Sequence, residues 1–187
     1  DRLIVTFSKF AKNNPKAILM LHCDPWDAAA IVNIIEMSRQ YGIHEKVVYT
    51  GATLHTPYTD QELLQIYNLF DISASSTSGE GFGLTAIESM SCEIPMIITD
   101  CTTTFELITE NNAGIAVPVK GVITGTWNVD RSVIDVDKMA EAFQYLYDNP
   151  SEGEKMGRNG RQAVLRDYDW RNVYKNWKEL LFEVLQK

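Results

Sequence analysis

Several features typical of membrane, secreted and metal-binding proteins are missing from this sequence of 187 residues. No apolar run approaches the ~20 residues that a membrane-spanning helix needs. The three cysteines, Cys23, Cys92 and Cys101, include no Cys-x-x-Cys pair, which argues against a disulfide framework and a zinc site. The histidines lack the spacing of metal ligands, and we expect no Asp-x-Asp pair near a strand end. We therefore expect reduced thiols, no metal and no transmembrane segment.

Positive charge is also scarce. The sequence holds 17 lysines and arginines against 25 aspartates and glutamates, which gives a net charge of −8. Because phosphate backbones are bound mainly by dense Lys and Arg, this balance argues against a nucleic-acid partner and an anionic membrane surface. The chain begins at Asp1, without a methionine or a signal-peptide pattern. We expect a piece of a longer, cytoplasmic protein.

Short apolar strands alternate with helical patterns along the first two thirds of the chain. The predicted strands are residues 17–21, 47–49, 71–74, 95–98 and 114–117. The helices are predicted over residues 3–11, from an Asp24 cap to Gly42, from a Thr59–Glu62 capping box, from Gly83 towards Cys92, and from a Thr103–Glu106 capping box. This alternation is typical of a parallel sheet covered on both faces, so the fold class is α/β.

The last third of the chain follows a different pattern. Residues 120–134 are rich in Gly and Thr and predict a surface excursion around Trp127. Helices are predicted over residues 136–148, from a Ser151–Glu154 capping box, and from Trp170 onward. We therefore expect one α/β domain over residues 1–187 with a C-terminal helical tail.

The loop from Ser75 to Gly83 is the best candidate for a binding site. Its glycines at alternate positions let the backbone approach a ligand, and the following helix start offers free N–H groups to a phosphate. Glu80 lies in this loop and Glu88 lies inside the helix, so hydroxyls on either side of a bound diphosphate would meet a carboxylate. The ligand implied is a sugar–diphosphate–ribose. The alternative is an ordinary glycine-rich turn with a glutamate that only partners the helix dipole.

The string from Glu80 to Met90, followed by residues 95–99, resembles the signature of retaining glycosyltransferases of family 4, in the GT-B superfamily. The hallmark of this family is two glutamates separated by seven residues, as Glu80 and Glu88 are. Four other segments are similar to the family's pattern, namely residues 47–51, 62–67, 104–108 and 168–170.

This resemblance implies a Rossmann-like, doubly wound C-terminal domain that binds a nucleotide sugar, most simply UDP- or GDP-linked. Glu80 would be the catalytic contact to the donor sugar, and Glu88 would hold the ribose hydroxyls. The other implied donor-binding residues are Gly81, Phe82, Gly83, Leu84 and Thr85, with Gly51 and Ala52 near the nucleobase. Transfer would retain the anomeric configuration and need neither a metal nor another cofactor.

The resemblance also implies parts that lie outside this chain. Residues 168–187 would form a terminal helix that crosses to an N-terminal domain, which would bind a glycan, lipid or protein acceptor. In the doubly wound order 3-2-1-4-5-6 the first strand is central, whereas this chain opens inside the helix that follows that strand. We therefore expect the strands at 18–21 and 72–74 to keep unpaired edges, and the isolated fragment to be inactive.

The sequence departs from the family's pattern in three ways. The Arg and Lys that usually bind the diphosphate have no match here, Glu93-Ile94 precedes Pro95 in place of a small residue, and Thr102 to Thr104 replace glycines. His22, Cys23 and Asp24 are predicted to be a strand end and a helix cap, with a catalytic pair on the cleft side as the alternative. Tyr58 is predicted to be a surface aromatic, with stacking near the nucleobase as the alternative. Two alternative functions stay open: a non-catalytic nucleotide-binding or assembly module of the same fold, and a sugar-nucleotide 2-epimerase-like enzyme.

Overall fold

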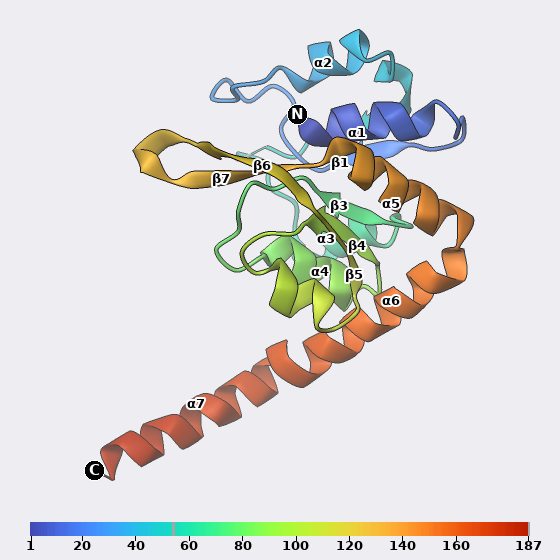
Figure 1. Ribbon diagram of the computed structural model, residues 1–187. Helices are drawn as coiled ribbons and strands as arrows, with labels where there is room; N and C mark the ends of the chain where they lie inside the picture. Colours follow the sequence, from blue (N-terminus) through green and yellow to red (C-terminus); the bar gives the residue numbers. More distant parts are fainter. Residues whose placement is uncertain (54, 187) are drawn as a thin grey trace.

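The computed structural model describes residues 1–53 and 55–186 (Figure 1). All five predicted strands are present. β1 (Leu19–Leu21) pairs in parallel with β2 (Val47–Tyr49), and β4 (Met96–Thr99) lies between β3 (Ser73–Ser75) and β5 (Gly114–Val117) in a second parallel sheet. The α/β fold class predicted from the alternation is therefore confirmed.

The two parallel sheets are separate where the sequence predicts an absent central strand. Within the described residues, β1 pairs only with β2. β3 pairs only with β4 and is therefore an edge strand of the second sheet. A cavity of about 530 Å³ lies between them, lined by both strands and by Phe7, Phe10 and Phe143. The unpaired edges predicted for β1 and β3 are thus confirmed.

The helices cover both faces of this arrangement. Their bounds are α1 (Arg2–Ala11), α2 (Ile34–Gln40), α3 (Asp60–Tyr67), α4 (Leu84–Ser91), α5 (Val136–Asp148), α6 (Pro150–Ala163) and α7 (Trp170–Leu185), with short 3-10 turns η1 (His44–Lys46) and η3 (Thr126–Asn128) and π-helical turns η2 (Phe105–Thr109) and η4 (Val164–Tyr168). β4 is buried throughout. Because side chains alternate along a strand, Ile97 joins a core cluster with α1 and α5, whereas Met96 and Ile98 join one with α4, η2 and α6.

One predicted helix begins later than expected. α2 starts at Ile34, behind an Asn33 cap, and not near Asp24. The carboxylate of Asp24 accepts a hydrogen bond from the backbone N–H of Trp26, at 2.9 Å, which closes a turn. Asp27 does the same with Ala29, at 2.8 Å. Such local side-chain bonds compete with helix formation, so residues 24–33 stay in turns and bends.

Only one of the three predicted capping boxes forms. Thr59 and Glu62 bond reciprocally at the start of α3. The Thr103–Glu106 box was wrong, because the chain there enters the π-helical turn η2 and the hydroxyl of neighbouring Thr104 donates to the carbonyl of Thr99 at 2.7 Å. The Ser151–Glu154 box was also wrong. Pro150 occupies the first position of α6 and starts that helix before Ser151 can cap it.

The predicted surface excursion is an ordered antiparallel hairpin. β6 (Val119–Thr124) pairs with β7 (Asp130–Ile134), and the turn between them holds Trp127 with a left-handed φ of 67° and 90% of its surface exposed. The hairpin projects from the body of the domain (Figure 1). In the middle of β7, the backbone N–H of Ser132 donates to the carbonyl of Ser78 at 3.0 Å, so the hairpin is attached to the glycine-rich loop.

The terminal helix α7 extends away from the sheets beyond α6 (Figure 1). None of its described side chains is buried, and most of its apolar residues, among them Trp177 and Leu181, are more than half exposed. No helix among residues 1–53 and 55–186 is long and apolar enough to span a bilayer. That α7 crosses to a further domain stays a prediction.

Candidate functional site

The glycine-rich loop connects β3 to α4, as predicted, and Gly83 sets the geometry of the connection. Gly83 is the N-cap of α4 with a φ of 91°, a left-handed conformation that favours glycine. A Cβ at this position would come within 2.8 Å of Leu107 Cδ1. No side chain of the described residues caps α4. The first N–H groups of this helix are therefore directed towards the loop without a competing carboxylate or hydroxyl cap.

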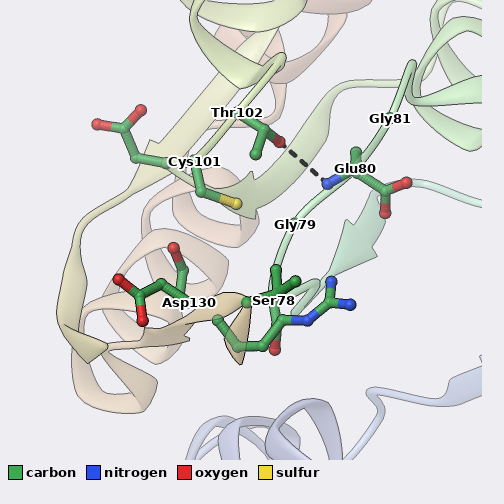
Figure 2. Close-up of a pocket in the computed structure, with 11 residues that line it drawn as sticks. Ser78, Gly79, Glu80, Gly81, Cys101, Thr102 and Asp130 are labelled. Carbon is green, nitrogen blue, oxygen red and sulfur yellow. Dashed lines mark hydrogen bonds between the residues drawn. The ribbon is translucent and has the colours of Figure 1, made fainter. Parts of the chain in front are cut away.

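Among the residues that the structure describes, Glu80 is held through its backbone N–H, and its side chain makes no hydrogen bond or ion pair. Its N–H donates to the hydroxyl of Thr102 at 3.0 Å, which ties the glycine-rich loop to the segment that follows β4 (Figure 2). Thr102 has a φ of 47°, in the left-handed region. This is one of the positions where the family pattern has glycine, so the backbone conformation that glycine favours is present although the residue is threonine.

The half-buried Glu80 lines a pocket of about 430 Å³. Three segments form the pocket: the loop over residues 78–81, the segment over residues 100–102, and the part of the hairpin that follows its turn, residues 129–132 (Figure 2). Its charged side chains are Glu80, Asp100, Asp130 and Arg131. Carboxylates and a guanidinium around a small polar pocket suit a ligand with several hydroxyl groups, because each group offers fixed hydrogen-bond acceptors or donors. The hairpin's part in this pocket was not predicted.

Glu88 lies outside the residues that line this pocket, on the side of α4 that meets α3. Its carboxylate Oε2 accepts a hydrogen bond from the hydroxyl of Tyr67 at 2.8 Å. Tyr67 is 8% exposed, and burial, followed by the bond to Glu88, raises its pKa well above the usual value. The phenol therefore remains a proton donor at neutral pH. The sequence pattern placed Tyr67 in a helix similar to the family's but gave no signal of this contact.

The other predicted donor-binding residues lie on the loop and on the first turn of α4. Phe82 is half-exposed and packs edge-on against Tyr168, with 6.0 Å between ring centroids. Leu84 and Thr85 are exposed, and Gly81 has open space around it. The backbone of this stretch is thus accessible, whereas Gly83 is buried against Leu107 and Thr103.

Gly51 and Ala52, the residues predicted near a nucleobase, follow β2. Gly51 turns the chain with a φ of 77°. Two aromatic rings gather there that the sequence did not connect: His22 and Tyr58 lie 5.5 Å apart between ring centroids. Both contact Thr50, His22 through the threonine hydroxyl at 3.0 Å and Tyr58 by donating to the carbonyl. Tyr58 is half-buried in this cluster, so its expected role as a surface aromatic was incomplete.

No group of three or more His, Cys, Asp or Glu side chains placed to hold a metal occurs in the described part of the chain. One Asp-x-Asp pair does follow a strand, the unpredicted β7. In that pair Asp135 caps α5 by accepting from the N–H groups of Asp137 and Lys138, and the Asp137 carboxylate binds Lys9 at 2.6 Å. Asp135 therefore caps α5, and Asp137 joins α5 to α1 through an exposed ion pair.

Comparison with known proteins identifies relatives of this chain. The family model described as "Glycosyl transferases group 1" matches residues 1–163. Glycogen synthase of Mycobacterium tuberculosis is 26% identical over 140 residues, which cover 75% of this chain and 29% of the relative. Mannosylfructose-phosphate synthase of Agrobacterium fabrum is 31% identical over 104 residues, covering 53% of this chain and 22% of the relative. The chain spans less than a third of the length of either relative.

Solved structures of the same fold agree with the architecture. Sucrose-phosphate synthase from Thermosynechococcus elongatus superposes with a TM-score of 0.76 at 21% identity, covering 98% of this chain and 42% of that one. The pneumococcal O-GlcNAc transferase GtfA, solved with UDP and GlcNAc, gives a TM-score of 0.72 at 18% identity, over all of this chain and 33% of that one. At such identities the likeness establishes the fold, with the parallel sheets and helical tail in common.

Proposed function

The chain belongs to the glycosyl transferases group 1 family, and we propose that it forms the donor-binding part of a retaining, family 4 type enzyme that transfers a sugar from a nucleotide sugar. The observation that carries this proposal is the placement of Glu80 and Glu88. A single loop-and-helix unit puts Glu80 among the residues that line the pocket and the Glu88 carboxylate on a helix face, with accessible backbone between them.

Each group of residues then has one part of the donor to bind. Glu80 contacts the transferred sugar, and the pocket around it accepts the sugar's hydroxyls. The N–H groups from Gly81 to Leu84 and the positive end of the α4 dipole stabilise the diphosphate, since a helix N-terminus favours anions. Glu88 accepts hydrogen bonds from the ribose hydroxyls, because a carboxylate offers two acceptor oxygens to a diol.

The nucleobase would lie near Gly51 and Ala52. The His22–Tyr58 pair beside them supports this placement, because aromatic rings stack on bases without requiring a particular base. UDP- and GDP-linked sugars are the donors to test first, and ADP-linked sugars complete the panel. A glycan, lipid or protein acceptor would be bound by a further domain.

The transfer step itself conserves the anomeric configuration. The bond between the anomeric carbon and the diphosphate oxygen breaks, and the nucleoside diphosphate leaves with the electron pair. An acceptor hydroxyl forms the new bond on the same face of the sugar and gives its proton to the departing diphosphate. Fixed donors at the diphosphate and a carboxylate at the sugar stabilise the developing charges, so the proposal requires no metal.

Donor hydrolysis by the full-length protein tests this function. UDP-, GDP- and ADP-sugars are incubated with the wild type, with Glu80→Gln and with Glu154→Gln, a matched control on the exposed face of α6. We expect release of the nucleoside diphosphate from one donor class, loss with Glu80→Gln, and no change with the control. Binding without release would favour the non-catalytic module, and inversion at C2 of the sugar would favour the epimerase-like alternative.

A further inference from the structure

We propose that Tyr67 is a positioning residue for nucleotide binding: its hydroxyl fixes one oxygen of the Glu88 carboxylate so that the other oxygen faces the ribose diol. This inference rests on the proposed function of Glu88 and adds to it a residue that neither the sequence pattern nor the comparisons assign. The observation behind it is the 2.8 Å hydrogen bond between Tyr67 Oη and Glu88 Oε2, which joins α3 to α4 across 21 residues.

The tyrosine is itself rigidly held. α3 begins at the complete Thr59–Glu62 capping box, which fixes the N-terminal end of the helix. At the other end Tyr67 is 8% exposed and packs edge-on against Phe70, with 5.7 Å between ring centroids. A phenol has a single O–H donor, and this one is committed to Glu88. The hydroxyl is therefore a fixed anchor for the carboxylate.

No other side chain of the described residues anchors Glu88. Arg161 lies on α6, which packs against α4, but its guanidinium donates to the carbonyl of Ser91 at 2.9 Å and forms no ion pair with Glu88. Cys92, one turn along α4, has a pKa raised mainly by burial and also by the charge of Glu88, so it stays a neutral thiol at pH 7. The orientation of the Glu88 carboxylate thus depends on Tyr67.

Anchoring has a definite consequence for a diol. A freely rotating carboxylate loses torsional freedom when it binds two hydroxyls, whereas one already fixed through Oε2 has less to lose. The bond from Tyr67 therefore contributes to binding only when the ligand presents the ribose hydroxyls that Glu88 accepts. A residue that merely fills space between α3 and α4 would affect every nucleotide equally.

The test compares ribonucleotides with their 2′-deoxy counterparts in the full-length protein. UDP, GDP and ADP are titrated calorimetrically, and the tightest binder is compared with its 2′-deoxy form in the wild type, in Tyr67→Phe and in Tyr145→Phe. Tyr145 is the matched control, a half-exposed tyrosine on α5 whose hydroxyl makes no hydrogen bond within residues 1–53 and 55–186. Removing one hydroxyl anchor weakens the ribonucleotide by roughly 5-fold, as expected for one net hydrogen bond, and weakens the 2′-deoxy form by less, because that ligand keeps only the 3′ hydroxyl of the diol.

Several outcomes would overturn this role. If Tyr67→Phe weakened both ligands equally, so that the ratio of ribo to 2′-deoxy affinity stayed unchanged, Tyr67 would be a packing residue. Loss of cooperative thermal unfolding in this variant would mean the same. In the Glu88→Gln background, Tyr67→Phe should cause no further loss of affinity, and an additive loss contradicts positioning through Glu88. If the wild type bound no nucleoside diphosphate, or bound the ribonucleotide and its 2′-deoxy form equally tightly, the proposed function would be overturned, and the inference with it.

Discussion

The two glutamates of the signature are eight positions apart, yet the protein holds them in opposite ways. Glu80 is fixed through its backbone N–H by Thr102, and it lines a pocket bounded by three segments of the chain. Glu88 is fixed through its carboxylate by Tyr67, on a helix packed into the core beside Met90. A side chain left free of partners suits contact with a group that changes during reaction, whereas an oriented carboxylate suits equilibrium binding. This difference predicts that substitution of Glu80 mainly lowers kcat, whereas substitution of Glu88 mainly raises the Kd for the nucleotide.

The largest effect is expected at Glu80. Glu80→Ala should lower kcat by roughly 10²- to 10⁴-fold, because a group that stabilises charge or transfers a proton in the transition state contributes about that much. The Kd for the nucleoside diphosphate should hardly change, since Glu80 faces the sugar. Parallel turnover and calorimetry measurements check this split. Equal losses in binding and rate would show that Glu80 is only a ground-state contact.

A smaller effect, confined to binding, is expected at Glu88. Glu88→Gln keeps the shape of the side chain but removes its charge, and a hydrogen bond from a ligand to a charged group contributes about 1.5–3 kcal/mol. The Kd for the nucleoside diphosphate should therefore rise roughly 10- to 100-fold, while the thermal unfolding of the variant stays cooperative. Unchanged affinity in calorimetry would remove Glu88 from the ribose site.

The connection between the two glutamates can be tested by stability. Gly83→Ala places a Cβ 2.8 Å from Leu107 Cδ1 on a backbone with a φ of 91°. A left-handed conformation costs a non-glycine residue about 1–2 kcal/mol, so we expect at least that loss in the free energy of unfolding. Gly121→Ala, on β6 with nothing within 4 Å of the place its new methyl group would take, is the control and should change stability by less than ~0.5 kcal/mol. Equal denaturation midpoints for the two variants would contradict this account of the loop.

No effect is expected from a chelator. If amides and the α4 dipole stabilise the diphosphate without a metal, transfer by the full-length protein persists in excess EDTA. Turnover measured before and after chelation checks this directly. Loss of activity that Mn²⁺ or Mg²⁺ restores would place a metal at the diphosphate. The α4 N-terminus would then stabilise less of the diphosphate charge than we propose.

The parts of this structure that follow from local pattern were predictable, and those that depend on distant contacts were not. Apolar runs and a single reciprocal capping box located the five parallel strands and α3. The hairpin over residues 119–134 was missed because its turn is formed by Trp127 at a φ of 67°, a conformation that no sequence pattern signals for tryptophan.

The candidate site shows the same division. The spacing of Glu80 and Glu88 is visible in the sequence, and the structure places both residues on the predicted loop and helix. The Tyr67–Glu88 bond, the His22–Tyr58 pair and the hairpin wall at Arg131 join residues far apart in the chain. Without an alignment or a fold, the sequence contains no signal that links such positions.

Saturation-transfer NMR on the full-length protein with UDP-, GDP- and ADP-sugars tests the central claim most directly, because it reports which protons of a donor contact the protein. We predict saturation of both ribose and sugar protons for one of these donors. Glu88→Gln should reduce the ribose signals and Glu80→Ala the sugar signals. Absence of saturation for all three donors, or an equal response of both sets of protons to either substitution, would contradict the assignment of the two glutamates to the two ends of a nucleotide sugar.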